Sequence, residues 1–313
     1  MDDLCFENNI EELHTVLLGL LKEFHRVCKE NDIQYFAIAG TLLGAIRHQG
    51  FIPWDDDADI ALTRDNYEKL KKVASRGAFK MPYFFQNPET DQGFPRGFSR
   101  LRDSRTTEIP YDDVAMKCNR GVFIDIIPID VIPNSNKLFK NQIRNLKIKR
   151  SLMNSYARYY SGFGTLYTTL PKKIAYYLSI PLFKFGILSM KKLFYSFEKT
   201  ASKYLKTDST LMGQITLAFD NKRCIYKRKW LNNGIIEVAF EDTKICIPKD
   251  YDMFLKVGYG SDYMTPLHLS SCHGDTLFST RIPYNSFIEI HKNKLMTGWI
   301  KQTEIGKKKN IKI

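Results

Sequence analysis

Hydrophobic positions repeat every three or four residues near the start of the chain. Residues 10–28 show this spacing, which is typical of an amphipathic helix with one face toward a core. Residues 35–39 then predict a short buried strand, and Gly40 and Thr41 end it before a brief helix through Ile46. The pattern therefore predicts a helix, a strand, a glycine turn and a second helix, in that order.

Two further segments extend this pattern into a mixed core. Residues 57–62 alternate polar and apolar side chains, as a strand with one face toward a site does, and Thr63 can cap a helix over residues 64–75. Residues 122–127 predict a third strand, which Pro128 should stop. We therefore expect the α/β (α+β) class, with a mixed sheet core.

The middle of the chain differs from the rest in charge. Residues 131–197 contain twelve Lys or Arg and no Asp or Glu, which accounts for nearly the whole formal net charge of +13. The segment is also aromatic, and it predicts helices on either side of a break at residues 161–171. Its most apolar part, residues 174–190, carries Pro181 and Lys184 and is too short and broken for a membrane-spanning helix. Two interpretations stay open: a basic helix in an anionic membrane interface, or a helical subdomain whose lysines face water.

The rest of the chain returns to mixed composition. A hairpin is expected over residues 235–247 and a helix over residues 249–257. We divide the chain into a catalytic core at 1–130, a basic aromatic helical segment at 131–205, a C-terminal part at 206–305 that completes the catalytic domain, and a basic tail at 306–313. We expect the tail to be mobile.

Composition narrows the class of protein. A chain of 313 residues with 43% hydrophobic residues excludes disorder and collagen-like structure. The six cysteines lie far apart without CxxC pairs, so we expect reduced thiols rather than a zinc or redox motif. The first residues lack a basic and an apolar region, so we expect a cytoplasmic protein.

The candidate chemistry concentrates just before the second predicted strand. Asp55, Asp56, Asp57 and Asp59 place four carboxylates within five residues, and their mutual repulsion calls for a compensating cation. Residues two apart in a strand share a face, so Asp57 and Asp59 should point together, and Asp55 can join them. Such oxygen ligands select hard ions, Mg²⁺ or Mn²⁺.

A phosphate site is expected upstream of these carboxylates. A strand that ends in Gly40 and Thr41 and opens a helix offers backbone N–H groups to a phosphate, and Arg47 is near enough in sequence to add charge. Asp125 stands in an otherwise apolar strand and is a candidate third metal ligand or base, whereas Asp130 is expected in a turn or cap. Together these features favour phosphoryl transfer over a solvated acidic turn.

The two motifs resemble the LicD family of phosphotransferases, relatives of fukutin and fukutin-related protein. The resemblance rests on residues 40–60, with Gly-Thr-Leu-Leu-Gly and Trp-Asp-Asp-Asp-Ala-Asp-Ile, and on Phe-Ile-Asp-Ile-Ile-Pro-Ile-Asp at residues 123–130. It implies a nucleotidyltransferase fold in which the Gly-Thr turn holds the donor phosphates. It also implies that Asp57, Asp59 and Asp125 bind Mg²⁺.

A shorter match to the family lies near the C-terminus. It includes residues 251–264, Pro266 and His273. The sequence departs from the family there, with Leu267 where a second proline is usual and no arginine just before His273. The basic middle segment has no counterpart in the resemblance.

The resemblance implies a donor and an acceptor. Family members that are enzymes move phosphocholine from CDP-choline, or an alditol phosphate such as ribitol or glycerol phosphate from its CDP derivative, onto a sugar of a surface glycan such as lipopolysaccharide or teichoic acid. We expect phosphocholine transfer for this chain, with transfer of an alditol phosphate as the alternative and CMP as the leaving group in both. If the basic segment lies at an anionic membrane surface, the glycan acceptor is expected to be lipid-linked there. For a choline group, Trp54, Tyr156, Tyr159 and Tyr160 are candidate cation–π partners.

Two competing functions follow from the same residues. A polymerase-like site on a basic chain suits a nucleotide-adding enzyme acting on RNA, but no RNA-binding motif accompanies the basic segment, so nucleic acid is not the expected partner. A binding protein that holds an ion only structurally is the other alternative. The complete set of three carboxylates argues against it.

Overall fold

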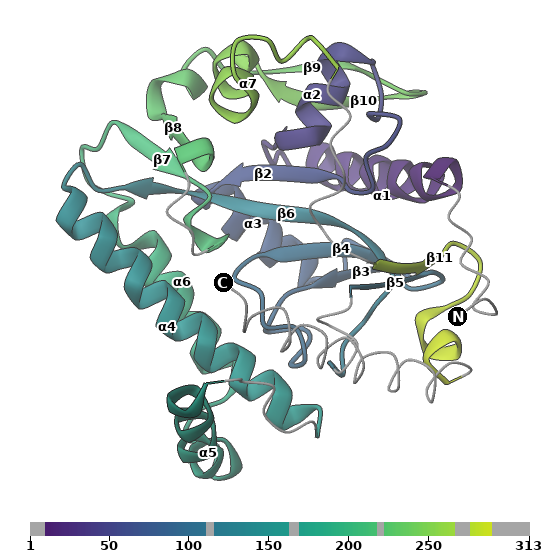
Figure 1. The fold of residues 1–313 in the computed structure, drawn as a ribbon. Helices are drawn as coiled ribbons and strands as arrows, with labels where there is room; N and C mark the ends of the chain where they lie inside the picture. The colour runs from purple at the N-terminus through teal and green to yellow at the C-terminus, as the bar shows by residue number, and fades with distance from the viewer. Residues whose placement is uncertain (1–9, 111–115, 163–168, 218–221, 267–275, 290–313) are drawn as a thin grey trace, which may run out of the picture.

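The computed structural model describes residues 10–110, 116–162, 169–217, 222–266 and 276–289. A mixed sheet lies at its centre (Figure 1), built from β1 (Phe36–Ala37), β2 (Asp59–Thr63), β3 (Tyr83–Gln86), β4 (Ser99–Asp103), β6 (Val122–Ile132), β7 (Leu211–Gly213) and β8 (Ile225–Lys227). The strand order is β1-β2-β6-β4-β3, and β7 extends the sheet by pairing with both β6 and β8. Only β2 and β6 run parallel; the other pairs in this sheet are antiparallel. The expected α/β class is confirmed.

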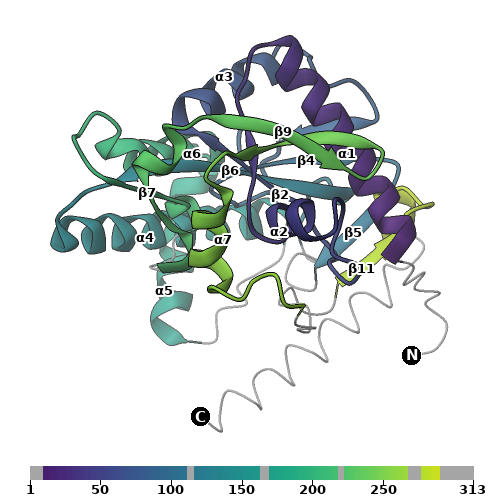
Figure 2. The ribbon, with the colours of Figure 1, turned by 90° about the horizontal axis from the view of Figure 1, so that it is seen from above.

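Two amphipathic helices, α1 (Ile10–Glu30) and α3 (Arg64–Ala74), cover one face of the sheet (Figures 1 and 2). The apolar stripe of α1 that the sequence pattern predicts is buried, from Leu13 to Cys28. Each fully buried leucine of such a stripe contributes about 1.5–3 kcal/mol to the free energy of unfolding. Between these helices in sequence, the short helix α2 (Ala39–Arg47) follows β1 directly, as the glycine turn predicts.

Strand β6 runs past Pro128, so the expectation that this proline stops the strand is wrong. The backbone N–H of Asp125 donates to the Ala58 carbonyl on the β2 side of the strand. Successive residues of a strand direct their N–H groups to opposite edges, so residue 128 faces the β4 side. Pairing with β4 ends at Ile126, and the N–H that Pro128 lacks has no ladder position to fill there.

The basic segment forms three helices, α4 (Asn136–Tyr160), α5 (Leu170–Lys184) and α6 (Met190–Ala201). The predicted break between two helical parts is confirmed, because α4 ends before it and α5 begins within it. Ser135 and Ser189 cap α4 and α6 through their side chains. These helices share a second hydrophobic core, in which Phe194 and Phe197 are fully buried.

A buried ion-pair network joins this helical part to the sheet. Asp130 is fully buried in β6, and its two carboxylate oxygens accept from Nε and a terminal nitrogen of Arg64 on α3, at 2.8 and 2.6 Å. Arg64 also pairs with Glu198 of α6 at 3.1 Å, and Lys71 pairs with the same carboxylate. The expectation that Asp130 lies in a turn or cap is therefore wrong.

Elements of the C-terminal part contact elements from the first part of the chain. The predicted hairpin is confirmed as β9 (Ile235–Phe240) and β10 (Thr243–Pro248), and the predicted helix as α7 (Tyr251–Tyr259). A separate pair joins β5 (Thr107–Pro110) to β11 (Thr276–Ser279). The four-part division of the chain stays a prediction, and the basic tail lies outside the described residues.

Two further observations concern the whole described chain. Cys28, Cys118, Cys224 and Cys246 are free thiols. Across the described residues, every helix is too short or too polar to cross a lipid bilayer.

Candidate functional site

The parallel pairing of β2 with β6 places two of the predicted carboxylates side by side. Asp59, the first residue of β2, is the register partner of Asp125 in β6. Both side chains are half-buried, although most of their neighbours in the two strands are fully buried. A polar face therefore opens at this end of the two central strands.

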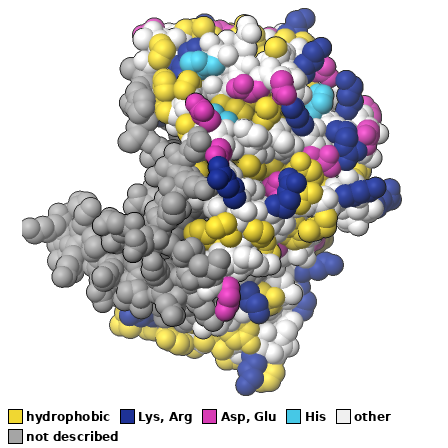
Figure 3. Space-filling model, turned by 90° about the vertical axis from the view of Figure 1, so that its right-hand side faces the viewer, with side chains coloured by type: hydrophobic (Ala, Val, Ile, Leu, Met, Phe, Trp, Pro, Cys, Tyr) yellow, Lys and Arg dark blue, Asp and Glu magenta, His cyan; other side chains and the backbone are white. Residues whose placement is uncertain are grey.

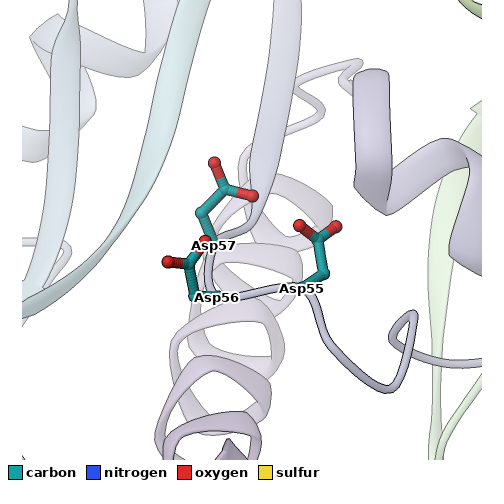
Figure 4. A group of neighbouring side chains, drawn as sticks. All are labelled: Asp55, Asp56 and Asp57. Carbon is teal, nitrogen blue, oxygen red and sulfur yellow. The ribbon is translucent and has the colours of Figure 1, made fainter. Parts of the chain in front are cut away.

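A cluster of three carboxylates, which we call the acidic cluster, precedes β2. Asp55, Asp56 and Asp57 each offer one oxygen within 4.8 Å of the others. Figure 4 shows their side chains rising from the segment that leads into the strand. The sequence prediction included Asp55 and Asp57 as ligands but left out Asp56, because a strand that begins early would turn Asp56 to the opposite face. The segment is not yet a strand at these positions, so that alternation does not apply.

The first turn of α2 lies against this cluster. A side chain on Gly40 would collide with the Asp55 carboxylate, so only glycine lets that carboxylate approach the helix start. Ala39 has a positive φ of 50°, an unusual conformation for alanine at the beginning of a helix. The Thr41 hydroxyl accepts a hydrogen bond from the backbone N–H of Asp59 at 2.8 Å and so ties the glycine turn to β2.

Residues distant in sequence fix the backbone of the acidic cluster. The ring of His14 on α1 is 2.7 Å from the Asp55 carbonyl oxygen and stacks on Phe51 at 4.4 Å between ring centroids. The Glu241 carboxylate, in the turn of the β9–β10 hairpin, accepts from the backbone N–H of Phe51 at 3.0 Å. Its own N–H donates to the Gln49 carbonyl at 2.7 Å. The loop before β2 is thus held from both sides by elements that the local sequence pattern does not connect to it.

Arg47 lies at the other end of α2 from Gly40. The two are seven positions apart, which corresponds to about 10 Å along the helix axis. Its guanidinium donates to the Tyr263 carbonyl at 3.1 Å and to the ring of His48 at 2.9 Å. The role of Arg47 toward a phosphate stays a prediction, and this geometry favours a contact with the segment after α7.

The remaining predicted site residues fall in different places. The partly buried Trp54 packs against the hydrophobic core of the central sheet. The centroid of its ring lies 6.5 Å from that of His48. Tyr156 and Tyr159 of α4 pack against Phe183 in the second core, which makes them part of the helical body. His273 lies outside the described residues.

Arg100 is one residue of the site that the sequence interpretation missed. It is buried in β4 as the register partner of Asp125, and its Nε donates to the Asp125 carboxylate at 2.6 Å. The guanidinium lies over the ring of Phe123, 3.5 Å from the centroid. One terminal nitrogen of Arg100 has no hydrogen-bond partner among the described residues. A buried arginine with a donor to spare, held against a predicted metal ligand, is suited to an anionic ligand.

A second missed group limits the negative charge around the site. Glu108 is buried in β5, and this burial is the main reason that the pKa of its carboxyl rises to about 8. Arg102 and Arg100 lower that pKa, whereas Asp56 raises it. At neutral pH Glu108 is therefore mostly protonated, and it adds little charge to the acidic cluster.

A pocket of about 200 Å³ opens beside the first turn of α2. Ile38, Ala39 and Leu42 line it on the α2 side. Gln214 and residues of β8, α7 and the turn before β8 complete the lining, including Arg223, Tyr226 and Tyr259. Figure 2 shows α2 and α7 side by side. The Asp59 carboxylate is near enough to raise the pKa of Tyr226, one of the residues that line the pocket, although burial is the main cause of that rise.

Comparison with known proteins agrees with this geometry. Residues 32–151 match the family model described as LicD/FKTN/FKRP, nucleotidyltransferase domain. The chain is similar to the lipopolysaccharide cholinephosphotransferase LicD of Haemophilus influenzae, with 28% identity over 260 residues, which are 82% of this chain and 91% of that protein. Uncharacterized proteins of Rickettsia prowazekii and Rickettsia typhi are 44% and 48% identical over 57 residues, 18% of this chain and 21% and 18% of theirs. The matched segment contains the acidic cluster, Asp59 and Asp125, so these carboxylates lie in the part of the chain that matches the LicD-family nucleotidyltransferase domain.

Proposed function

We propose that the protein is a metal-dependent transferase that moves phosphocholine from CDP-choline onto a sugar of a surface glycan. The observation that carries the proposal is the register of Asp59 with Asp125, next to the acidic cluster and the first turn of α2. The choice of phosphocholine is supported by the similarity to the Haemophilus cholinephosphotransferase. A ribitol or glycerol phosphate donor would use the same carboxylates.

The described residues fit a divalent cation. The acidic cluster provides three carboxylate oxygens within 4.8 Å of one another, a donor set typical of Mg²⁺ or Mn²⁺. Asp57 belongs to this cluster and lies two residues before Asp59, so we expect Asp57, Asp59 and Asp125 to hold the ion with help from Asp55 or Asp56. A bound ion would neutralise charge on the donor diphosphate.

The protein's own groups would then orient the donor. The first N–H groups of α2 point toward the acidic cluster end of the helix and suit a phosphate. Arg100 supplies a cation on the opposite side of Asp125. Since Asp125 already accepts a charge-assisted hydrogen bond from Arg100, we assign Asp125 to metal binding rather than to taking a proton from the acceptor.

Arg100→Lys tests the arginine. Lysine keeps the charge but loses the planar guanidinium that lies over Phe123 and bonds Asp125. We expect kcat/KM to fall by about 10–100-fold, corresponding to one charged hydrogen bond. The matched control, Arg105→Lys, changes an exposed arginine that pairs with Asp103 and should leave kcat/KM within about twofold. Equal effects of both substitutions would contradict a role of Arg100 in the site.

We propose that the pocket beside α2 receives the nucleoside of the donor. Tyr259→Ala removes an aromatic ring from its lining, whereas Met253→Ala changes an exposed side chain of the same helix that does not line it. Loss of an aromatic contact to a base costs about 1–3 kcal/mol, so CMP binding measured by calorimetry should weaken by about 5–150-fold in the first variant only. Unchanged CMP affinity in Tyr259→Ala would place the nucleoside elsewhere.

A transfer assay with labelled donors tests the function itself. The protein is incubated with Mg²⁺, a glycan acceptor and either CDP-choline labelled in the choline, CDP-ribitol or CDP-glycerol. The proposal requires label in the glycan from CDP-choline, release of CMP, and loss of both in Asp59→Asn. Transfer only from an alditol donor would correct the substrate, and incorporation of labelled CTP into RNA would replace the proposed function.

A further inference from the structure

Helix α5 has two apolar faces, and the protein covers only one of them. Tyr176, Ser179 and Phe183 are buried. Their spacing of three and four residues puts them on one side of the helix. The Phe183 ring contacts the rings of Tyr156 and Tyr159 on α4 at 5.3 and 5.6 Å between centroids. This side of α5 therefore has its partner within the chain.

The other side of α5 exposes large apolar side chains to solvent. Four follow one another at helical spacing, and two more lie in the turn after the helix: Leu170 (68% exposed), Ile174 (49%), Tyr177 (58%), Leu178 (71%), Phe185 (76%) and Ile187 (55%). We call these six residues the apolar tip. Figure 3 shows hydrophobic side chains gathered at the lower end of the molecule, the level that α5 occupies in Figure 1. A helix that is apolar on both sides requires a second partner.

The turn after α5 is held in a defined conformation. Gly186 adopts a φ of 66°, which glycine tolerates without strain. The Lys192 ammonium donates to the carbonyls of Gly186 and Ile187 at 3.0 and 3.2 Å. Phe185 and Ile187 are therefore presented outward by an ordered turn.

Charge decides which partner fits the apolar tip. Lys172, Lys173 and Lys184 of α5 and Lys191 of α6 are exposed, and residues 131–197 contain no acidic side chain. A second copy of the chain would bring these lysines against one another, which is unfavourable. Leucine and isoleucine side chains add nothing to binding of nucleic acid phosphates, whereas an anionic lipid surface accepts both apolar side chains and lysines.

We propose that α5 and the turn after it dock the protein on an anionic lipid bilayer. The apolar tip enters the boundary between headgroups and acyl chains, and the surrounding lysines contact the headgroup phosphates. Tyr177 suits that depth, where amphipathic rings are favoured. The inference does not rest on the proposed function, because lipid binding is measured without donor or acceptor.

Sedimentation with vesicles tests the proposal. The full chain is mixed with vesicles of phosphatidylglycerol and phosphatidylcholine, or of phosphatidylcholine alone, at low and at high salt. We expect binding to the anionic vesicles at low salt and weaker binding at high salt. Leu178→Gln with Phe185→Gln should lower the partition coefficient by at least about tenfold. Each lysine contributes about fivefold, so Lys172→Gln, Lys173→Gln and Lys184→Gln together should lower it by about 100-fold.

Matched variants complete the test. Met81→Gln changes an exposed apolar residue elsewhere, and Lys80→Gln, Lys206→Gln and Lys244→Gln together remove three exposed lysines elsewhere. Both controls should leave the partition coefficient within about twofold. The proposal is overturned if the unmodified protein does not bind anionic vesicles at low salt, or if the controls lose as much binding as the α5 variants. A dimer in sedimentation velocity that Leu178→Gln with Phe185→Gln dissociates, without vesicle binding, would assign the tip to a second copy instead.

Discussion

Asp59→Asn is expected to lower turnover by about 10³-fold or more while the protein stays folded. The carboxylate lies beside Asp125 and close to the acidic cluster, and metal coordination of reacting phosphates provides several kcal/mol of transition-state stabilisation. Without added metal, the thermal midpoint should stay the same or rise, because one charge leaves a crowded acidic site. Turnover is measured as CMP release from CDP-choline, and the midpoint by differential scanning fluorimetry.

Two companions separate metal binding from general loss of charge. Asp125→Asn should reduce turnover to the same extent and still bind CMP, whereas Asp208→Asn, at an exposed position just before β7, should change nothing. In calorimetry Asp59→Asn and Asp125→Asn should lose Mn²⁺ binding, whereas Asp208→Asn should keep it. Full activity of Asp59→Asn would rule out the proposed ligand set.

Asp130→Asn is expected to lower the free energy of unfolding by about 3–5 kcal/mol, the usual cost of removing one partner of a buried ion pair. Arg64 is almost wholly buried and pairs with both carboxylate oxygens of Asp130. Asp242→Asn serves as the control, since it breaks an ion pair with Lys22 that is exposed on both sides and worth at most about 1 kcal/mol. Urea unfolding measures both values.

In Asp130→Asn, the helices α4 to α6 should unfold locally before the rest of the protein. Glu198 of α6 shares Arg64 with Asp130, so loss of Asp130 weakens the attachment of α6 to the sheet. Proteolysis should then cut within residues 136–201 faster than in the unmodified protein. A loss below about 1 kcal/mol would show that packing of Phe194 and Phe197 alone attaches these helices.

Local periodicity was sufficient to predict the helices, because α1 and α3 carry their patterns within a few turns of chain. It also predicted β1, β2, β6 and the β9–β10 hairpin, but not β3, β4, β5, β7, β8 or β11. That Asp57 and Asp59 act together stays a prediction. Periodicity failed at Asp130 and Pro128, since β6 is buried on both faces and shows no alternation from which exposure could be deduced.

The residues that hold the loop before β2 in place could not be predicted from the sequence around that loop. His14 and Glu241 reach the loop before β2 from 41 and 190 positions away in sequence, and only the folded chain brings them there. Arg100 left one signal, the alternation of Arg100 and Arg102 about Leu101, which indicates a strand with a basic face. Which carboxylate that face meets depends on the pairing of β4 with β6, a long-range choice.

The helical part leaves and re-enters the sheet at a single place. Ile132, at the end of β6, is the register partner of Leu211, at the start of β7, so the two ends of the intervening 78 residues are adjacent. Because the two ends of this segment are adjacent, its length can change without a change in the geometry of the sheet. Helical turns added at the C-terminal end of α4 would place α5 farther from the sheet. The separation of Asp59 and Asp125 would not change. The distance from α5 to the sheet can therefore vary independently of the arrangement of the site carboxylates.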